Sequence, residues 1–251
     1  MIDIELRTIS DSGLQVVGRI LGNEMSDKLL VCSHGFGVKS DSGGIFNMVC
    51  ESFKEQFLTV RIHYVSIDDF TDSTFVYEFS KQVEKLMTVI QKTQEKYGSK
   101  KITIIGHSQG CLIPSLMLQK YPMEIEKLIL LAPSPTTDLV NKMTSYWGKR
   151  VGSEVNLKGK SVFARANGST TYLPAAFWEE AKKTVPLDAF KFVESHYPTY
   201  FIRALDDTVV LKEDYEKLKE LHPKNYYELK NGHDFKEDNR LALLTVLNEI
   251  L

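Results

Sequence analysis

The segment Gly106-His107-Ser108-Gln109-Gly110 carries the clearest signal of chemistry in this chain. A serine flanked by glycines at this spacing is typical of a nucleophile on a sharp strand-to-helix turn, where small residues let the backbone pass and the hydroxyl projects outward. Average glycine usage gives such a pattern by chance in roughly one chain in ten of this length. A plain helix cap at Ser108 is the structural alternative. The surrounding residues must decide between them.

A serine hydroxyl is a weak nucleophile at neutral pH, so it needs a base and a carboxylate that holds the base in the right tautomer. His233 has a glycine neighbour and follows a predicted strand. Asp206 and Asp207 follow an earlier strand. The order serine, acid, histidine is one that places all three at one edge of an α/β sheet. We prefer Asp207 because it lies further beyond the strand end.

Three other histidines compete with His233 for the role of base. His63 lies within a predicted strand, and His222 stands before Pro223, where a solvated or capping histidine is the simpler interpretation. His196 lies near the end of an irregular segment and is harder to dismiss. Only His233 combines a glycine neighbour, a loop after a strand and a position downstream of the acid, so we assign it as the base.

Acyl transfer also needs two N–H donors for the oxyanion that develops on the carbonyl oxygen. Gln109, which follows the serine, offers one backbone amide. The loop His34-Gly35-Phe36-Gly37 follows a predicted strand, and its glycines allow the Phe36 amide to face the same point. The alternative is an ordinary flexible glycine turn. We predict an oxyanion hole formed by Phe36 and Gln109.

Apolar runs alternate with helical periodicity along most of the chain. Two short stretches, 2–9 and 14–21, predict an antiparallel hairpin. Apolar runs predict further strands at 28–33, 57–65, 101–105, 127–131, 200–204 and 226–229. Three- and four-residue spacing predicts helices at 75–94, after Ser108, at 212–221 and at 240–251. This alternation predicts an α/β fold whose mainly parallel sheet is flanked by helices and binds ligands at the carboxyl ends of its strands.

Residues 134–196 interrupt the alternation. This stretch is rich in aromatic and basic residues, and its pattern predicts a hairpin over 162–173 that turns at Asn167-Gly168. We therefore predict a core of residues 1–133 and 197–251 with an inserted cap subdomain at 134–196.

Composition limits the classes of partner. A net charge of −2 and 25% charged residues give no basic excess for nucleic acid or an anionic membrane, so we expect a small-molecule substrate. The first residues lack a secretory signal, and no apolar run approaches the 18 or so residues of a bilayer span, so we expect a cytoplasmic protein. Cys32, Cys50 and Cys111 have no metal-ligand spacing. We expect no metal, and a homodimer is compatible with these features.

Together these motifs resemble the α/β-hydrolase superfamily, most closely bacterial intracellular feruloyl or cinnamoyl esterases. The resemblance rests on His-Gly-Phe-Gly, Gly-His-Ser-Gln-Gly, the segment Asp206-Asp207-Thr208-Val209-Val210 and Asn231-Gly232-His233. It implies an inserted cap, Asp207 as the triad acid, the Phe36 and Gln109 amides as the oxyanion hole, and no cofactor. It also places a polar substrate contact near Asp138. Tyr172, Phe177 and Trp178 would line a substrate pocket, although packing of the cap onto the core explains them equally well.

Two segments depart from that family pattern. Arg203-Ala204 stands where members commonly have His-Gly, and residues 67–73 replace a Gly-x-Gly-x-Ser loop. Pro114 stands inside the predicted helix after Ser108, where it removes a backbone hydrogen bond. The pocket wall is therefore expected to differ from that of the family.

The residues thus predict a serine carboxylesterase that hydrolyses small acyl or aromatic esters through an acyl-enzyme. The same triad also suits amide, monoacyl lipid or thioester substrates, because a triad specifies acyl transfer better than the leaving group. A non-catalytic binding protein with this fold is the alternative from another class.

Overall fold

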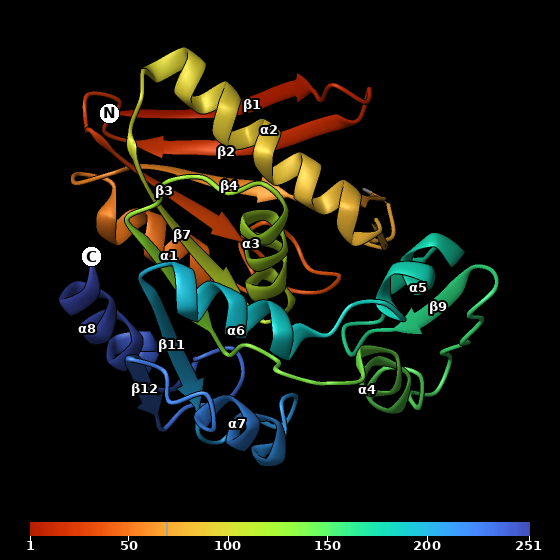
Figure 1. Ribbon diagram of the computed structural model, residues 1–251. Coiled ribbons are helices and arrows are strands. Elements are labelled where there is room, and N and C mark those ends of the chain that lie inside the picture. The colour runs from red at the N-terminus through yellow and green to blue at the C-terminus, as the bar shows by residue number, and fades with distance from the viewer. Residues whose placement is uncertain (69) are drawn as a thin grey trace.

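The computed structural model describes residues 1–68 and 70–251 (Figure 1). Asp69, in the segment 67–73 that departs from the family pattern, lies outside the described residues. None of the described helices is long and apolar enough to cross a membrane.

An eight-stranded sheet forms the centre of the molecule. From one edge to the other its strands are β1 (Ile2–Ile9), β2 (Gln15–Gly22), β4 (Leu58–His63), β3 (Lys28–Ser33), β7 (Lys101–His107), β8 (Lys127–Leu131), β11 (Thr199–Ala204) and β12 (Asn225–Leu229). The first two strands run antiparallel to their neighbours, and the other six are parallel. The predicted α/β architecture and its antiparallel edge hairpin are confirmed.

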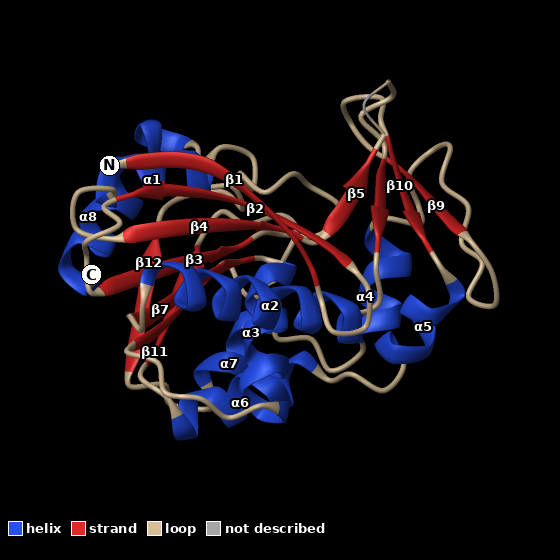
Figure 2. Ribbon diagram, turned by 90° about the horizontal axis from the view of Figure 1, so that it is seen from above, coloured by secondary structure: helices blue, strands red, loops and turns tan. Residues whose placement is uncertain are grey.

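Helices cover both faces of this sheet (Figure 2). They are α1 (Ile45–Phe53), α2 (Phe79–Tyr97), α3 (Gln109–Lys120), α6 (Pro186–His196), α7 (Lys212–Lys219) and α8 (Leu241–Ile250), with a short 3-10 helix at Glu237–Arg240. Alternate residues of β3 divide between two cores, since Leu29 and Val31 pack with α2 and α3, whereas Leu30 and Cys32 pack with α1 and α8. Strands buried on both faces explain their nearly continuous apolar runs.

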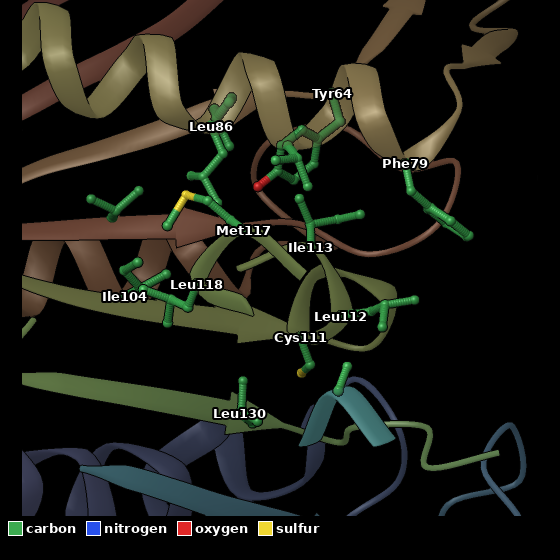
Figure 3. Close-up of a cluster of buried hydrophobic side chains, with 14 of the residues drawn as sticks. Tyr64, Phe79, Leu86, Ile104, Cys111, Leu112, Ile113, Met117, Leu118 and Leu130 are labelled. Carbon is green, nitrogen blue, oxygen red and sulfur yellow. The ribbon is translucent and has the colours of Figure 1, made fainter. Parts of the chain in front are cut away.

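The first of these cores fills the space between α2, α3 and the sheet (Figure 3). Leu86 of α2 and Met117 of α3 are fully buried there beside Ile104 of β7. This packing fixes α3, and therefore the residue at its amino end, relative to the sheet. The position of Ser108 thus follows from ordinary packing in the core.

A smaller sheet stands beside the main one in Figure 2. Its strands are β5 (Val65–Ile67), β6 (Thr74–Val76), β10 (Thr170–Leu173) and β9 (Ser161–Ala164), in that order. The last two form the predicted hairpin. Helices α4 (Leu139–Tyr146) and α5 (Ala175–Ala181) lie beside it, whereas α6 packs on α3 of the core. The small sheet therefore joins residues 65–76 to the inserted region.

The prediction of a helix over 75–94 was wrong at its start. Phe75 lies in β6, and α2 begins at Phe79. The four-residue spacing of these two phenylalanines imitates a helical repeat, but pairing of β6 with both β5 and β10 holds Phe75 in an extended strand. Helix α1 follows the loop after β3, a region in which the sequence pattern predicts no element.

Pro114 lies inside α3 and has a structural explanation. Proline lacks the N–H that would bond to the carbonyl four residues earlier, so the Gly110 carbonyl is left without its helical donor. The Ser33 hydroxyl of β3 donates to that carbonyl at 2.7 Å, and the Tyr64 hydroxyl bonds to Ser33 Oγ at 2.8 Å. Pro114 thus frees an acceptor that ties α3 to the end of β3.

Candidate active site

Ser108 occupies the turn between β7 and α3, and its backbone is strained. Its φ of 55° and ψ of −124° lie in a region that residues with a side chain rarely adopt. A Cβ atom on Gly106 would collide with the Gly110 carbonyl, and one on Gly110 would collide with the Ser33 carbonyl. Gly106 is therefore required by the tightness of the turn itself, and Gly110 by the close crossing of the turn over β3. This is the geometry of a nucleophile elbow.

Asp207 and His233 are brought together by two loops at the carboxyl ends of β11 and β12. The Nδ1 atom of His233 lies 2.8 Å from Oδ2 of Asp207. The Asp207 side chain is 1% exposed and that of His233 is 14% exposed. Asp206 is exposed, so it does not share this position. Ser108 and His233 line the same cavity.

Further hydrogen bonds keep Asp207 in its anionic form. Its Oδ1 accepts the backbone N–H groups of Val209 and Val210 at 2.7 and 2.9 Å, and its Oδ2 also accepts the Tyr215 hydroxyl at 3.1 Å. Burial raises the pKa of Asp207, but the hydrogen bond and charge of His233 and the two N–H groups outweigh it, so the net pKa is lowered. The carboxylate is therefore ionised when His233 binds to it.

Arg203, one of the departures from the family pattern, supports this carboxylate indirectly. Its guanidinium lies 4.8 Å from the ring centre of Tyr215 and pairs with Glu228 at 3.2 Å. The Arg203 side chain is buried. It packs against the tyrosine whose hydroxyl donates to Asp207.

The loop that carries Phe36 is fixed by His34. The Tyr64 N–H donates to His34 Nε2 at 2.9 Å, which leaves Nδ1 to donate to the Gly35 carbonyl at 2.9 Å. Burial lowers the pKa of His34 to about 3, so its ring is neutral, as these bonds require. Among the described residues the Phe36 N–H donates to no acceptor, and Gln109 is the first residue of α3, where the N–H has no helical partner. Both residues line a cavity with Ser108.

His107 links three loops around Ser108. Its Nε2 donates to the backbone carbonyl of His233 at 2.9 Å, because a carbonyl can only accept. Its Nδ1 therefore accepts the Ser42 hydroxyl at 2.8 Å, and Ser42 Oγ accepts the Gly35 N–H at 3.3 Å. Burial, helped by the charge of His233, lowers the pKa of His107 to about 4. A neutral His107 thus joins the Phe36 loop to the His233 loop.

Two cavities of different character meet at Ser108. The first holds about 600 Å³, part of it open to solvent, and its apolar walls include Leu112, Leu139, Met143, Trp147, Phe190 and Val210. The second holds about 1720 Å³, is more open, and has polar and charged walls. Phe36, Ser108 and Trp147 line both, whereas His233 lines only the polar one.

The four predicted substrate contacts lie away from both cavities. Phe177 and Trp178 are fully buried, and Trp178 Nε1 donates to Ser161 Oγ at 2.9 Å. Tyr172 stacks on Phe75 with ring centres 4.7 Å apart. Asp138 caps α4 by accepting the Asn141 N–H at 2.9 Å. Packing of the cap therefore accounts for Phe177 and Trp178. The tryptophan that lines the cavities is Trp147.

The competing histidines are placed elsewhere. His196 ends α6, where its Nδ1 bonds to the Phe192 carbonyl at 2.8 Å and its ring stacks on Phe192. His63 ends β4, and His222 follows α7. None of the three lines a cavity at Ser108.

Tyr215, His107 and Ser42 belong to the site but were not predicted. His107 stands inside the serine motif, and this position was the only signal in the sequence. Tyr215 lies on α7, eight residues after the aspartate it bonds, and nothing in its local sequence indicates that contact.

Solved structures share this fold over their whole length. The chain is similar to the esterase domain of a Rhodothermus marinus protein (TM-score 0.71, 15% identity, covering 100% of this chain and 98% of that one). It is similar to the α/β hydrolase GrgF from Penicillium sp. sh18 (TM-score 0.75, 14% identity, covering 99% of this chain and 97% of that one). It is also similar to Est1E from Butyrivibrio proteoclasticus, solved with ferulic acid bound (TM-score 0.73, 19% identity, covering 98% of this chain and 97% of that one). The α/β-hydrolase fold is thereby confirmed.

Comparison of sequences identifies the family. No curated protein matches the chain. The family model for palmitoyl protein thioesterase matches residues 30–197, more than half of the chain. The matched region includes the Phe36 loop and the Ser108 elbow and ends before Asp207 and His233. This chain belongs to the palmitoyl protein thioesterase family of hydrolases.

Proposed function

We propose that this protein is a serine carboxylesterase that hydrolyses small acyl or aromatic esters. Ser108 attacks the ester carbonyl while His233 takes its proton, and Asp207 holds the imidazole in the required tautomer. The Phe36 and Gln109 amides stabilise the oxyanion. His233 then protonates the leaving alcohol, and water releases the acyl group from Ser108 by the reverse sequence of proton transfers.

The contact between Asp207 and His233 carries this proposal. A buried carboxylate 2.8 Å from an imidazole that shares a cavity with a strained serine is difficult to explain by stability alone. A positive φ at a residue with a side chain costs of order 1–3 kcal/mol, and such strain is typical of functional sites.

The apolar cavity supports an apolar acyl group. Its walls combine aliphatic side chains with Trp147 and Phe190, and few polar groups interrupt them. Such a lining suits short aliphatic chains and aromatic acids. The similarity to Est1E, which was solved with ferulic acid, supports an aromatic acid as one candidate.

A thioesterase is the second candidate, and the family match favours it. The triad would act on a thioester in the same way, with a thiol as the leaving group. Amide and monoacyl lipid substrates need no further residues. A binding protein without turnover has no feature of the described site in its favour.

Hydrolysis of 4-nitrophenyl esters of increasing acyl length, beside thioesters of the same acids, tests the proposal. We expect ester turnover that Ser108→Ala and His233→Ala abolish, with Ser195→Ala and His196→Ala as matched controls on α6. Faster turnover of thioesters would favour the second candidate. Ester turnover that survives in Ser108→Ala would refute both.

A further inference from the structure

The polar cavity beside Ser108 contains two arginines that form no salt bridge with its acidic residues within the described part of the chain. Arg150 follows α4, and Arg165 begins the turn of the β9–β10 hairpin. Four acidic residues also line this cavity: Asp41, Asp72, Asp234 and Glu237. Two of these acids pair with lysines instead, Asp72 with Lys39 and Asp234 with Lys236. A ligand anion could therefore bind either guanidinium without breaking a described salt bridge.

The two arginines are held beside the nucleophile by Trp147. Each guanidinium carbon lies 4.3 Å from a ring centre of Trp147, and the ring of Trp147 lies 5.6 Å from that of Phe36. Cation–π contact fixes the guanidinium planes but leaves their N–H edges free to bind another group. Arg165 Nη2 also contacts the Phe36 carbonyl at 3.4 Å. The pair therefore stands next to the residue whose amide is assigned to the oxyanion.

Arg165 has unused hydrogen-bonding capacity. Its Nη1 is buried without a partner among the described residues. Burial, together with the charge of Arg150, lowers its pKa to about 10, so it is still cationic at neutral pH. A partly buried guanidinium with a like charge nearby and an unpaired N–H is an unfavourable arrangement in the free protein. An anionic oxygen bound to this guanidinium would offset the charge repulsion from Arg150.

The position of His233 decides which part of the substrate meets these arginines. His233 must give its proton to the leaving group, and it lines only the polar cavity. The acyl group then occupies the apolar cavity, which shares Ser108 and Trp147 with the polar one. The leaving alcohol or thiol extends into the cavity that contains Arg150 and Arg165.

The geometry points to an anion subsite formed by Arg150 and Arg165, so that the substrates are esters or thioesters whose leaving group bears a carboxylate or phosphate. This inference rests on the proposed function and adds the substrate class to it. Guanidinium groups bind carboxylate and phosphate oxygens in a planar, bidentate way, which the single charge of a lysine does not reproduce.

The test compares three butyryl esters that differ only in the leaving group: phenol, 3-hydroxybenzoate and 3-hydroxyphenyl phosphate. We expect wild type to prefer one or both anionic esters over phenyl butyrate by about ten-fold in kcat/KM, as charge-assisted hydrogen bonds predict. Comparing kcat/KM for the two anionic esters shows whether carboxylate or phosphate is the preferred group. Using the ratio of anionic to neutral ester cancels any general effect on the Phe36 loop.

Arg150→Gln and Arg165→Gln should each lower that ratio by about ten-fold, again from the loss of a charge-assisted bond. The control is Lys160→Gln, which also removes one positive charge. Lys160 lies over the Tyr172 ring, outside both cavities. A wild-type ratio of one or less, or a ratio unchanged in both arginine variants, would overturn the subsite. If phenyl butyrate is still hydrolysed in a Ser108-dependent way, the proposed function stands while the subsite fails.

A second measurement does not depend on turnover. The chain has two tryptophans, and Trp178 is fully buried. Iodide should therefore quench Trp147 more effectively than neutral acrylamide does, because the arginines attract the anion. Arg150→Gln and Arg165→Gln should reduce iodide quenching relative to acrylamide, and Lys160→Gln should not. Equal relative quenching in wild type and both arginine variants would contradict the subsite.

Discussion

The carboxylate of Asp207 accepts hydrogen bonds from four donors, and these bonds explain how it stays ionised although it is almost fully buried. Val209 and Val210 satisfy one oxygen, and His233 and Tyr215 share the other. A buried anion is stable only when it is paired and hydrogen-bonded in this way. The Tyr215 bond is the part of the arrangement that a substitution can remove without moving the backbone.

Replacing Tyr215 with Phe should slow the chemical step. The change removes one hydrogen bond to Asp207 and leaves the ring that packs under Arg203. We expect kcat to fall by about ten-fold with KM nearly unchanged, since a hydrogen bond to a charged group contributes about 1.5–3 kcal/mol. Steady-state kinetics on 4-nitrophenyl butyrate measure both values. Tyr121→Phe, at an exposed position, is the control, and an unaltered kcat in Tyr215→Phe would remove Tyr215 from the site.

Motif order was sufficient to bring Ser108, Asp207 and His233 to one edge of the sheet, because each follows a strand that the sequence predicts. The same method could not find Tyr215 or His107. Their partners come from loops whose approach depends on how α7 and the His233 loop pack. The predicted cap residues lie away from both cavities, and for the three aromatic ones the sequence could not separate the two roles, since aromatic residues in a cap suit packing and binding equally.

At the scale of elements, α3 is tied to β3 by a bond that Pro114 makes necessary. The Gly110 carbonyl, which has no helical donor, accepts the Ser33 hydroxyl. Ser33 directly precedes His34 and the Phe36 loop, so this bond joins the helix that begins after Ser108 to the strand that carries the oxyanion loop.

A double-mutant cycle at Ser33 and Pro114 tests this link. Ser33→Ala leaves the buried Gly110 carbonyl unsatisfied and should lower the free energy of unfolding by about 1–3 kcal/mol. In the Pro114→Ala background, the new N–H can bond to Gly110 within the helix, so the same change should cost about 1 kcal/mol less. Tyr64 loses its partner in both backgrounds, and its effect cancels. Urea unfolding of the four proteins provides the measurement, and strictly additive costs would argue against the link.

Elements were predicted correctly where burial requires an apolar sequence. They were missed where strand pairing alone decides the conformation. The inner strands of the main sheet follow from apolar runs, because both of their faces are covered. Strand β6 has three residues, and only its partners β5 and β10 make it extended. Helix α1 begins after Gly44 without a side-chain cap, so no capping residue marks its start.

For the molecule as a whole, two buried neutral histidines make stability depend on pH. His34 and His107 have pKa values lowered to about 3 and about 4, against an ordinary value of 6.5 in the unfolded chain. Below pH 6.5 these two imidazoles bind protons in the unfolded state but remain neutral in the folded state. Their contribution is therefore fully present above pH 6.5 and is lost progressively as pH falls towards the folded pKa values.

The free energy of unfolding should accordingly fall between pH 6.5 and pH 5, above the range in which most carboxylates titrate. Each histidine adds a slope of up to about 1.4 kcal/mol per pH unit in this window. Urea unfolding at several pH values should give a smaller slope for His107→Gln than for wild type, with His222→Gln as the control. A stability that does not change between pH 6.5 and pH 5 would show that these rings are not held neutral.

The most direct test of the whole account is the site at which a fluorophosphonate labels the protein, read by peptide mass spectrometry. Such a reagent reacts with a serine only when a base activates it. We predict a single adduct, on the peptide that contains Ser108, that is absent in Ser108→Ala and forms much more slowly in His233→Ala. An adduct on another residue, or wild type that does not react at all, would contradict the assignment of Ser108 as the nucleophile.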